Sequence, residues 1–289
     1  MNVDGAAAAA DQAVRRAAVL GSPIEHSLSP VLHGAAYQAL DLHGWHYGKI
    51  ECDEAALPRL VDAMGPEWAG LSLTMPLKRV ALSVADEVSP LAEAVGAANT
   101  LVFSPAGPAA GSQAHNTDVA GIMGALKEAG LTRIEQAVIL GAGGTAQSAL
   151  AAVRELGHQT PIVLVRNLAR TGELRETADR LGMRPAISAG LFTGPLPAAD
   201  LIISTLPGGA ADSLSATRWK PDTMVLDVVY APWPTSLAGS AQAAGCPVIS
   251  GLAVLLHQAV AQVELMTGRP GPVEEMRTAL VAAVAARHG

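Results

Sequence analysis

The 289-residue chain has only two cysteines, Cys52 and Cys246, and they form neither a CxxC motif nor the spacing of metal ligands. So few cysteines argue against a disulfide framework and against a metal site, and indicate two packed, reduced thiols in a cytoplasmic protein. Clusters of lysine and arginine are also missing, and the formal net charge is −7. Nucleic acid and anionic membranes are therefore not expected as partners.

Long apolar runs are missing too, since none reaches the roughly 18 residues that a membrane-spanning helix needs. The first 16 residues are rich in alanine but include Asp4 and Asp11, without a basic segment ahead of a long apolar core. They do not resemble a secretory signal peptide, and we expect residues 1–16 to be a frayed tail or a short helix. The chain is long enough for two domains, and its 50% hydrophobic content predicts a sizeable core.

The most informative segment is QAVILGAGGTAQSAL at 136–150, where an apolar run leads into closely spaced glycines and then a helix-like run. The spacing Gly141-x-Gly143-x-x-Ala146 predicts a strand, a tight turn and a helix. Such a turn lets the backbone approach a pyrophosphate, which then faces the N–H groups and the positive dipole end of the helix. Taken alone, the glycines also fit an ordinary strand-to-helix turn.

The residues that follow favour the dinucleotide interpretation. In such folds the second strand ends with an acidic residue for the ribose of NAD, or with an arginine for the 2′-phosphate of NADP. Here the apolar run 161–165 is followed by Arg166 and then Arg170, with no acidic residue at the strand end. A guanidinium binds a phosphate dianion that a carboxylate would repel. The sequence thus predicts NADP(H), unless both arginines are solvated surface charges.

Strands and helices alternate after this point, which predicts a parallel sheet covered on both faces. The predicted fold class is α/β with two domains. They are an N-terminal α/β substrate domain and a Rossmann-type NADP-binding domain. The C-terminal helices are expected to return to the first domain. The boundaries are 17–117 for the substrate and catalytic domain, completed by 251–289, and 118–250 for the Rossmann domain. The apolar C-terminal helices equally fit packing against a second subunit in a homodimer.

Individual elements follow from periodicity and from turn residues. In the first half the predicted strands are 17–20, 47–52, 70–75 and 97–103, the helices are 31–40, 55–64, 80–84 and 119–129, and 104–112 is a hairpin-like loop. In the second half the predicted strands are 137–140, 161–165, 201–205, 224–229 and 247–249, and the helices are 147–156, 168–181, 252–266 and 272–287.

A nicotinamide enzyme acting on an alcohol or ketone needs a proton donor and acceptor. Of the four lysines, only Lys78 follows a strand-ending proline in a stretch rich in hydroxyls. Asp118 lies just before the cofactor domain and is suited to orient Lys78 or to hold a substrate hydroxyl. The alternatives are a surface charge for Lys78 and a helix cap for Asp118. Upstream, Ser29 suits a helix N-cap before Pro30, which leaves Ser27 without a structural role.

Seven motifs together resemble the ordered motif set of the shikimate dehydrogenases. They are GSPIEHSLSP (21–30), LSLTMPLK (71–78), GAANTLV (96–102), HNTDVAG (115–121), GAGGTA (141–146), LDVVY (226–230) and GLAVLLHQA (251–259). This resemblance, rather than composition or periodicity, implies the NADPH-dependent reduction of 3-dehydroshikimate to shikimate. The reaction belongs to the shikimate pathway, which leads to chorismate and the aromatic amino acids.

The resemblance also implies roles for individual residues. Lys78 and Asp118 would be the catalytic pair, and His257 would be only packed or solvated. The implied substrate contacts are Ser27, Ser29 and Tyr230 to the carboxylate, Thr74 to a hydroxyl or the carboxylate side, and Asn99 and Gln258 to ring hydroxyls, beside Lys78 and Asp118. The implied cofactor contacts are Gly141, Ala142, Gly143, Gly144, Thr145, Ala146, Arg166, Arg170, Thr205, Val228 and Gly251, the last beside the nicotinamide.

Two departures from the common pattern keep alternatives open. Ser72 stands where asparagine is usual in the family. Val165-Arg166-Asn167 stands in place of Asn-Arg-Thr. This second change keeps the guanidinium but removes an amide and a hydroxyl, which weakens the phosphate pocket. One alternative is a quinate/shikimate dehydrogenase with relaxed use of NAD and NADP. Another is a catalytically silent sensor of a shikimate-pathway metabolite, and a third is an amino-acid-dehydrogenase-like reductase. The presence of both Lys78 and Asp118 argues against a silent protein.

Overall fold

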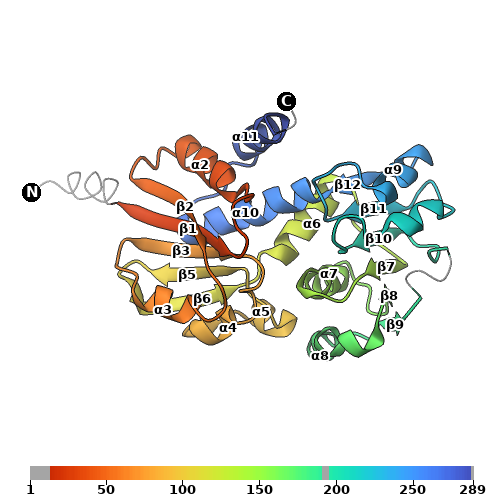
Figure 1. Cartoon of the computed structure of the whole chain (residues 1–289), viewed down its shortest axis with the longest axis horizontal. Coiled ribbons are helices and arrows are strands. Elements are labelled where there is room, and N and C mark those ends of the chain that lie inside the picture. Colours follow the sequence, from red (N-terminus) through yellow and green to blue (C-terminus); the bar gives the residue numbers. More distant parts are fainter. Residues whose placement is uncertain (1–13, 191–194, 288–289) are drawn as a thin grey trace, which may run out of the picture. The chain divides into compact units, whose positions relative to one another are not determined.

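The computed structural model describes residues 14–190 and 195–287 (Figure 1). Most of the predicted tail lies outside these residues, and its last part, Arg15 and Arg16, belongs to the first strand instead. The chain forms two compact units. One contains the described residues up to Glu93, with Ala97–Thr117 and the chain from Gln258 on, and the other contains Ala94–Gly96 and Asp118–His257. Both units combine helices with a sheet, which confirms the predicted α/β class.

The first unit is built on a six-stranded mixed sheet in the order β2-β1-β3-β5-β6-β4. Strand β1 is parallel to β2 and β3, whereas β5 is antiparallel to β3 and β6. The carboxyl ends of β1, β3 and β6 therefore meet the start of β5 at one edge of the sheet. The strands are β1 (Arg15–Gly21), β2 (Trp45–Glu51), β3 (Trp68–Leu73), β4 (Glu87–Val88), β5 (Thr100–Ser104) and β6 (Gly107–His115).

Strand β6 corrects the predicted loop at 104–112, because only the turn between Ser104 and Gly107 is left outside the strands. The glycines and prolines of this stretch suggested a loop, but Ser112 and Gly107 pair with Phe103 and Ser104 of β5, with an irregularity between these two pairs. Gly107 has φ of +96° and lies against Pro66, so it serves the tight turn rather than a longer loop. Pairing with a neighbouring strand has outweighed local propensity here.

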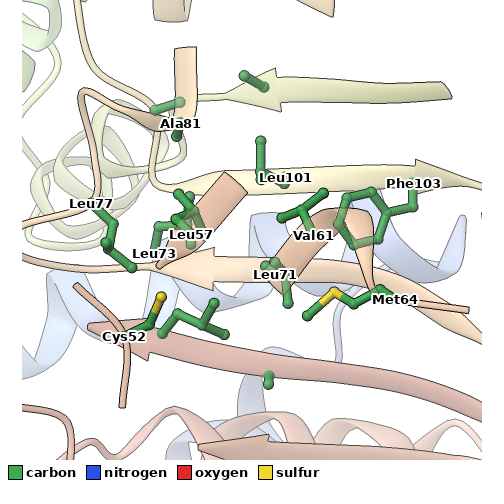
Figure 2. Packing of buried hydrophobic residues seen from close by; sticks show 14 of the residues in the cluster. Cys52, Leu57, Val61, Met64, Leu71, Leu73, Leu77, Ala81, Leu101 and Phe103 are labelled. Atoms are coloured by element: carbon green, nitrogen blue, oxygen red, sulfur yellow. The ribbon is translucent and has the colours of Figure 1, made fainter. Parts of the chain in front are cut away.

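Helices cover both faces of this sheet. On one face, Leu71, Leu101 and Phe103 belong to the same buried cluster as Leu57 and Val61, and Phe103 lies beside Val61 (Figure 2). On the other face α10 lies close to β3, and α11 packs on α2, as the predicted return of the C-terminal helices requires. The helices are α2 (Ser29–Ala39), α3 (Leu57–Asp62), α4 (Ala81–Val84), α5 (Pro90–Val95), α10 (Gly251–Thr267) and α11 (Val273–Ala285).

The second unit contains a six-stranded, entirely parallel sheet in the order β12-β11-β10-β7-β8-β9. All four residues of β7 are fully buried, so both faces of the sheet are covered, as predicted. The strands are β7 (Ala137–Leu140), β8 (Ile162–Leu164), β9 (Ala186–Ser188), β10 (Leu201–Ser204), β11 (Met224–Asp227) and β12 (Val248–Ser250). The helices are α6 (Asp118–Glu128), α7 (Gly144–Glu155), α8 (Gly172–Leu181) and α9 (Ser236–Ala243), with the 3₁₀ turns η1 (Leu168–Arg170) and η2 (Asp212–Ala216).

Two details of this unit differ from the prediction. The helix predicted at 168–181 is divided at Thr171 into η1 and α8, because the side chain of Asn167 caps a separate 3₁₀ turn. Strand β9 and helix α9 were not predicted, and β9 is a short, half-exposed edge strand without an apolar run. The strand order changes direction between β7 and β10. In parallel sheets of this kind, ligands bind at such a switch point, outside the carboxyl ends of the strands.

The two cysteines are buried and free, which confirms the predicted packed thiols. Burial raises the pKa of both Cys52 and Cys246, so neither thiol is poised for reaction. Among the described helices, none is long and apolar enough to cross a bilayer.

Candidate active site

A cleft of about 920 Å³ opens in the second unit at the switch point of the sheet. Its walls are the segments that follow β7, β8 and β10, which lie far apart in the sequence. The structure thereby brings together six of the predicted cofactor residues: Gly141, Ala142, Gly143, Arg166, Arg170 and Thr205. The cleft is also lined by Val165, Asn167, Ala169, Gly172, Glu173, Leu206 and Pro207.

The glycine turn has the geometry that a close phosphate contact needs. Gly141 has φ of +111°, and a Cβ there would lie 2.5 Å from the Thr205 hydroxyl oxygen, so only glycine fits. Helix α7 begins after Gly143, and no side chain caps its first turn. A methyl group added at Gly143 or Gly144 would meet nothing within 4 Å. The helix start therefore presents backbone N–H groups at an open cleft, as a pyrophosphate requires.

The far wall of the cleft carries the two arginines that the sequence predicted. Both Arg166 and Arg170 are exposed at its surface. Asn167, which departs from the family pattern, accepts a hydrogen bond from the backbone N–H of Ala169 at 2.9 Å. It thereby holds the turn that carries Arg170. Glu173 also lines this wall and was missed in the sequence, because its role depends on a helix boundary that the periodicity did not show.

Five other predicted cofactor residues are not among the residues that line the cleft. Gly144, Thr145 and Ala146 form the first turn of α7, and the side chain of Ala146 is fully buried. Val228 follows β11, and Gly251 begins α10. A Cβ at Gly251 would collide with the backbone carbonyl of Val228, so this glycine has a structural reason of its own.

In the first unit, the predicted substrate residues lie on segments tied together at one edge of the sheet. The Thr74 N–H donates to the Leu20 carbonyl at 2.9 Å, and the Leu73 N–H donates to the Asn99 carbonyl at 2.7 Å. The backbone carbonyl of Lys78 accepts a hydrogen bond from the Ala98 N–H at 2.7 Å. The backbones of Thr74, Lys78 and Asn99 are thus fixed relative to one another.

The start of α2 corrects the roles expected for the two serines. Ser29 is the first helical residue rather than the N-cap, because Leu28 already has a helical conformation. The hydroxyl oxygen of Ser27 accepts a hydrogen bond from the Ser29 N–H at 3.3 Å. Ser27 therefore has a structural role that we did not predict, because its side chain holds the start of α2. Ser29 is buried and Ser27 is partly exposed.

Asn99 and Gln258 are side by side in the structure, and both side chains are buried. The Asn99 amide nitrogen donates to the Gln258 side-chain oxygen at 3.2 Å. The Asn99 side-chain oxygen accepts the Thr117 N–H at 2.7 Å and hydrogen bonds from the hydroxyls of Thr100 and Thr117 at 3.1 Å. Three donors on one oxygen fix the amide with its nitrogen toward Gln258.

The predicted catalytic pair is divided between the two units. Lys78 is partly buried and belongs to the first unit, whereas Asp118 is the first residue of α6 and belongs to the second unit. The residue before it, Thr117, is the one that donates to Asn99. Tyr230 follows β11 and is partly buried.

Two further groups clarify the surroundings of the site. The buried Asp227 accepts hydrogen bonds from the Thr235 hydroxyl at 2.7 Å and the Val229 N–H at 3.2 Å, and so holds the loop that carries Tyr230. Burial raises the pKa of this carboxyl. His257 lies 2.6 Å from Glu128 and against Gly124, which confirms that it is a packed residue.

Sequence reasoning did not predict a network of four polar side chains that reaches Asn99 through Gln262. His33, Tyr47, Ser72 and Gln262 are linked to one another by hydrogen bonds. Ser72 had a signal in the sequence, since it stands at a motif position where asparagine is usual. Gln262 had another, since it follows Gln258 by four residues and so lies on the same side of α10. His33 is completely buried, and burial lowers its pKa from 6.5 to about 3.

A parallel sheet with an open cleft at its switch point, together with a second α/β unit with a polar sheet edge, defines a two-domain dehydrogenase with a Rossmann-type nucleotide-binding domain. Comparison with known proteins narrows this class. Residues 19–101 match the model of the shikimate dehydrogenase substrate binding domain, and residues 251–281 match the shikimate 5′-dehydrogenase C-terminal domain. The chain belongs to the shikimate dehydrogenase family.

Individual relatives are similar over nearly the whole chain. A shikimate dehydrogenase (NADP⁺) of Natronomonas pharaonis is 36% identical over 269 residues, which are 91% of this chain and 97% of the relative. The crystal structure of Mycobacterium tuberculosis shikimate dehydrogenase is 46% identical with a TM-score of 0.81, covering 93% of this chain and 99% of that one. The Thermus thermophilus enzyme, solved with NADP(H) and shikimate, is 30% identical with a TM-score of 0.80, covering 93% and 100%.

Proposed function

We propose that this chain catalyses the reversible, NADPH-dependent reduction of 3-dehydroshikimate to shikimate, in the pathway to chorismate and the aromatic amino acids. The observation that carries the proposal is the buried pair Asn99 and Gln258, at the sheet edge that also carries Thr74 and Lys78. Amides that donate and accept suit vicinal ring hydroxyls, and a nearby lysine suits a carbonyl that becomes an alcohol. The family relationship names the substrate that has these groups.

NADP(H) fits the cleft of the second unit, because the turn at Gly141 leaves backbone room and the start of α7 is open. We assign the pyrophosphate to residues 141–146 and the 2′-phosphate to Arg166 and Arg170. Thr205, Val228 and Gly251 are assigned to the nicotinamide side. When bound, NADPH supplies the hydride for the C3 carbonyl of the substrate.

The residues of the chain supply binding and proton transfer. Ser27, Ser29 and Tyr230 hold the carboxylate, and Thr74 contacts the same side of the substrate or a hydroxyl. Asn99 and Gln258 hold ring hydroxyls. Lys78 donates a proton to the developing alkoxide or stabilises its charge, and Asp118 orients both Lys78 and the substrate. If Lys78 is the donor, it takes the same proton back in the oxidative direction.

Three organisational features belong to this proposal. Residues 17–117 with 251–289 form the substrate domain, and residues 118–250 form the cofactor domain. The enzyme works in the cytoplasm, which two free, buried cysteines support. It forms a homodimer through the C-terminal helices, where the side chain of Val281 is 61% exposed on α11. Sedimentation of the wild type and of Val281→Glu tests the dimer, since a monomeric wild type would remove it.

The first experiment follows nicotinamide absorbance with shikimate or quinate as substrate, each with NADP⁺ and with NAD⁺. Turnover confined mainly to shikimate with NADP⁺ is the expected result. Equal use of quinate or NAD⁺ would favour the broader quinate/shikimate dehydrogenase. Binding of shikimate without turnover would favour a silent sensor instead.

Lys78→Ala should lower kcat by about 10²–10⁴-fold, the usual contribution of general acid–base catalysis. KM for shikimate should change little, because the proton transfer belongs to the transition state. The matched control is Lys127→Ala, which removes an exposed lysine of α6. A Lys78→Ala enzyme with nearly normal kcat would remove Lys78 from the mechanism.

A further inference from the structure

A chain of hydrogen bonds lies on the face of the first sheet that packs against α10. It connects β2 to the predicted substrate-binding edge of the sheet. The Tyr47 hydroxyl donates to the Ser72 hydroxyl oxygen at 2.6 Å, and Ser72 donates to the side-chain oxygen of Gln262 at 2.8 Å. The amide nitrogen of Gln262 donates to the Thr100 hydroxyl oxygen at 3.1 Å and to the Asn99 carbonyl at 3.3 Å. Ser72 and Gln262 are almost completely buried, with 3% and 1% of their surface exposed.

The direction of this chain is fixed at its Asn99 end. A backbone carbonyl only accepts, so the Gln262 amide must face Asn99 with its nitrogen, and its oxygen must face Ser72. Ser72 then has to use its single proton toward Gln262 and can only accept from Tyr47. Tyr47 is left as the donor. Burial raises the pKa of its hydroxyl, which keeps that proton in place.

The Tyr47 ring is held in place by a second member of the same network, His33. The ring stacks on His33 with 3.9 Å between centroids, and His33 itself lies 3.3 Å from the Gln262 side-chain oxygen. Tyr47 is therefore fixed at one end of a hydrogen-bonded path that leads through Ser72 and Gln262 to Asn99.

We propose that Tyr47 is a positioning residue for substrate binding, which aligns the pair Asn99 and Gln258 through Ser72 and Gln262. The inference rests on the proposed function and extends it to a residue outside the resemblance motifs. Since the Thr117 N–H also holds Asn99, loss of the Tyr47 hydroxyl should loosen the site rather than abolish it.

Tyr47→Phe tests this, with Tyr37→Phe as the matched control. The Tyr37 hydroxyl is also buried and its ring meets the same His33, but this hydroxyl has no hydrogen-bond partner within the described part of the chain. Tyr47→Phe should raise KM for shikimate about fivefold to tenfold, as loss of one buried hydrogen bond implies. The values of kcat and of KM for NADP⁺ should stay within about twofold, because ground-state and transition-state binding are affected alike. Tyr37→Phe should change none of them.

A second pair of variants separates positioning from general weakening of the fold. If Tyr47 acts through Ser72, then Ser72→Ala should raise KM to a similar extent, and the double variant should be no worse than either single one. A Tyr47→Phe enzyme with unchanged KM, or a double variant whose effects multiply, would overturn the inference. These outcomes differ from failure of the proposed function, in which the wild type itself would not oxidise shikimate.

Discussion

His33 offers a test of the buried polar cluster that does not depend on catalysis. Its side chain is completely buried on α2, stacked on Tyr47 and 3.3 Å from the side-chain oxygen of Gln262. Burial lowers its pKa from 6.5 to about 3, and the bond to Gln262 offsets this only in part. Burying a charged imidazole in this cluster costs desolvation free energy, so protonation of His33 should favour the unfolded chain.

The size of the effect follows from linkage. The unfolded state binds a proton near pH 6.5 and the native state only near pH 3, so this contribution to stability is complete above pH 6.5 and is lost as the pH falls. Each pH unit within the window costs about 1.4 kcal/mol. Between pH 7.5 and pH 4.5 the imidazole of His33 should therefore remove about 2–3 kcal/mol from the free energy of unfolding.

The assay compares urea unfolding of the wild type and His33→Gln at pH 7.5 and 4.5. Glutamine can still donate to Gln262, and at pH 7.5 the variant should lose only the aromatic contact, about 1 kcal/mol. On acidification the variant should lose about 2–3 kcal/mol less than the wild type, and all other titrating groups cancel in this comparison. The control is His46→Gln, the same change at an exposed histidine of β2, and its curve should parallel the wild type. Equal losses in His33→Gln and wild type would refute the reasoning.

Two further predictions concern the cofactor cleft. Gly141→Ala should raise KM for NADP⁺ about tenfold or more, because it adds positive-φ strain of about 1–2 kcal/mol and a clash with the Thr205 hydroxyl. Steady-state kinetics measure this against Gly34→Ala, where the added methyl meets nothing. Arg166→Leu should lower kcat/KM for NADP⁺ about 10–100-fold while NAD⁺ is affected little, since charge-assisted hydrogen bonds are worth about 1.5–3 kcal/mol. The control is Arg154→Ala, which should leave the preference for NADP⁺ over NAD⁺ as it is in the wild type. The assigned phosphate site would be contradicted if Arg166→Leu also left this preference unchanged.

The cofactor half of the chain was predictable because its signals are local. The strand β7, the turn at Gly141 and the start of α7 follow one another directly, and Arg166 comes at the end of the next strand. Parallel strands bring their carboxyl ends to one edge, so these segments had to meet once the βαβ rhythm was recognised. What remained hidden was Glu173, because it required the break between η1 and α8.

The first unit was less predictable because its site depends on contacts between distant residues. Ser72 and Gln262 are separated by 190 positions, and His33 and Gln262 by 229. Neither pair has a local pattern, and a histidine on an apolar helix gives no sign of its partner. The start of α2 was misjudged for a similar reason. The pattern Ser-Pro suggested a cap at Ser29, but the helical conformation of Leu28 moved the helix start one residue earlier.

The structure also decides which motif residues can test function. Gly251→Ala would lose activity whether or not Gly251 contacts the nicotinamide, because the added Cβ collides with the carbonyl of Val228. Replacing Ser27 would likewise remove a hydrogen bond at the start of α2 along with any contact to a carboxylate. Arg166 differs from both, because it is exposed at the wall of the cleft and outside the core. A selective loss of NADP⁺ affinity on its removal would therefore report on the cofactor alone, which makes it the sharpest test of the assigned site.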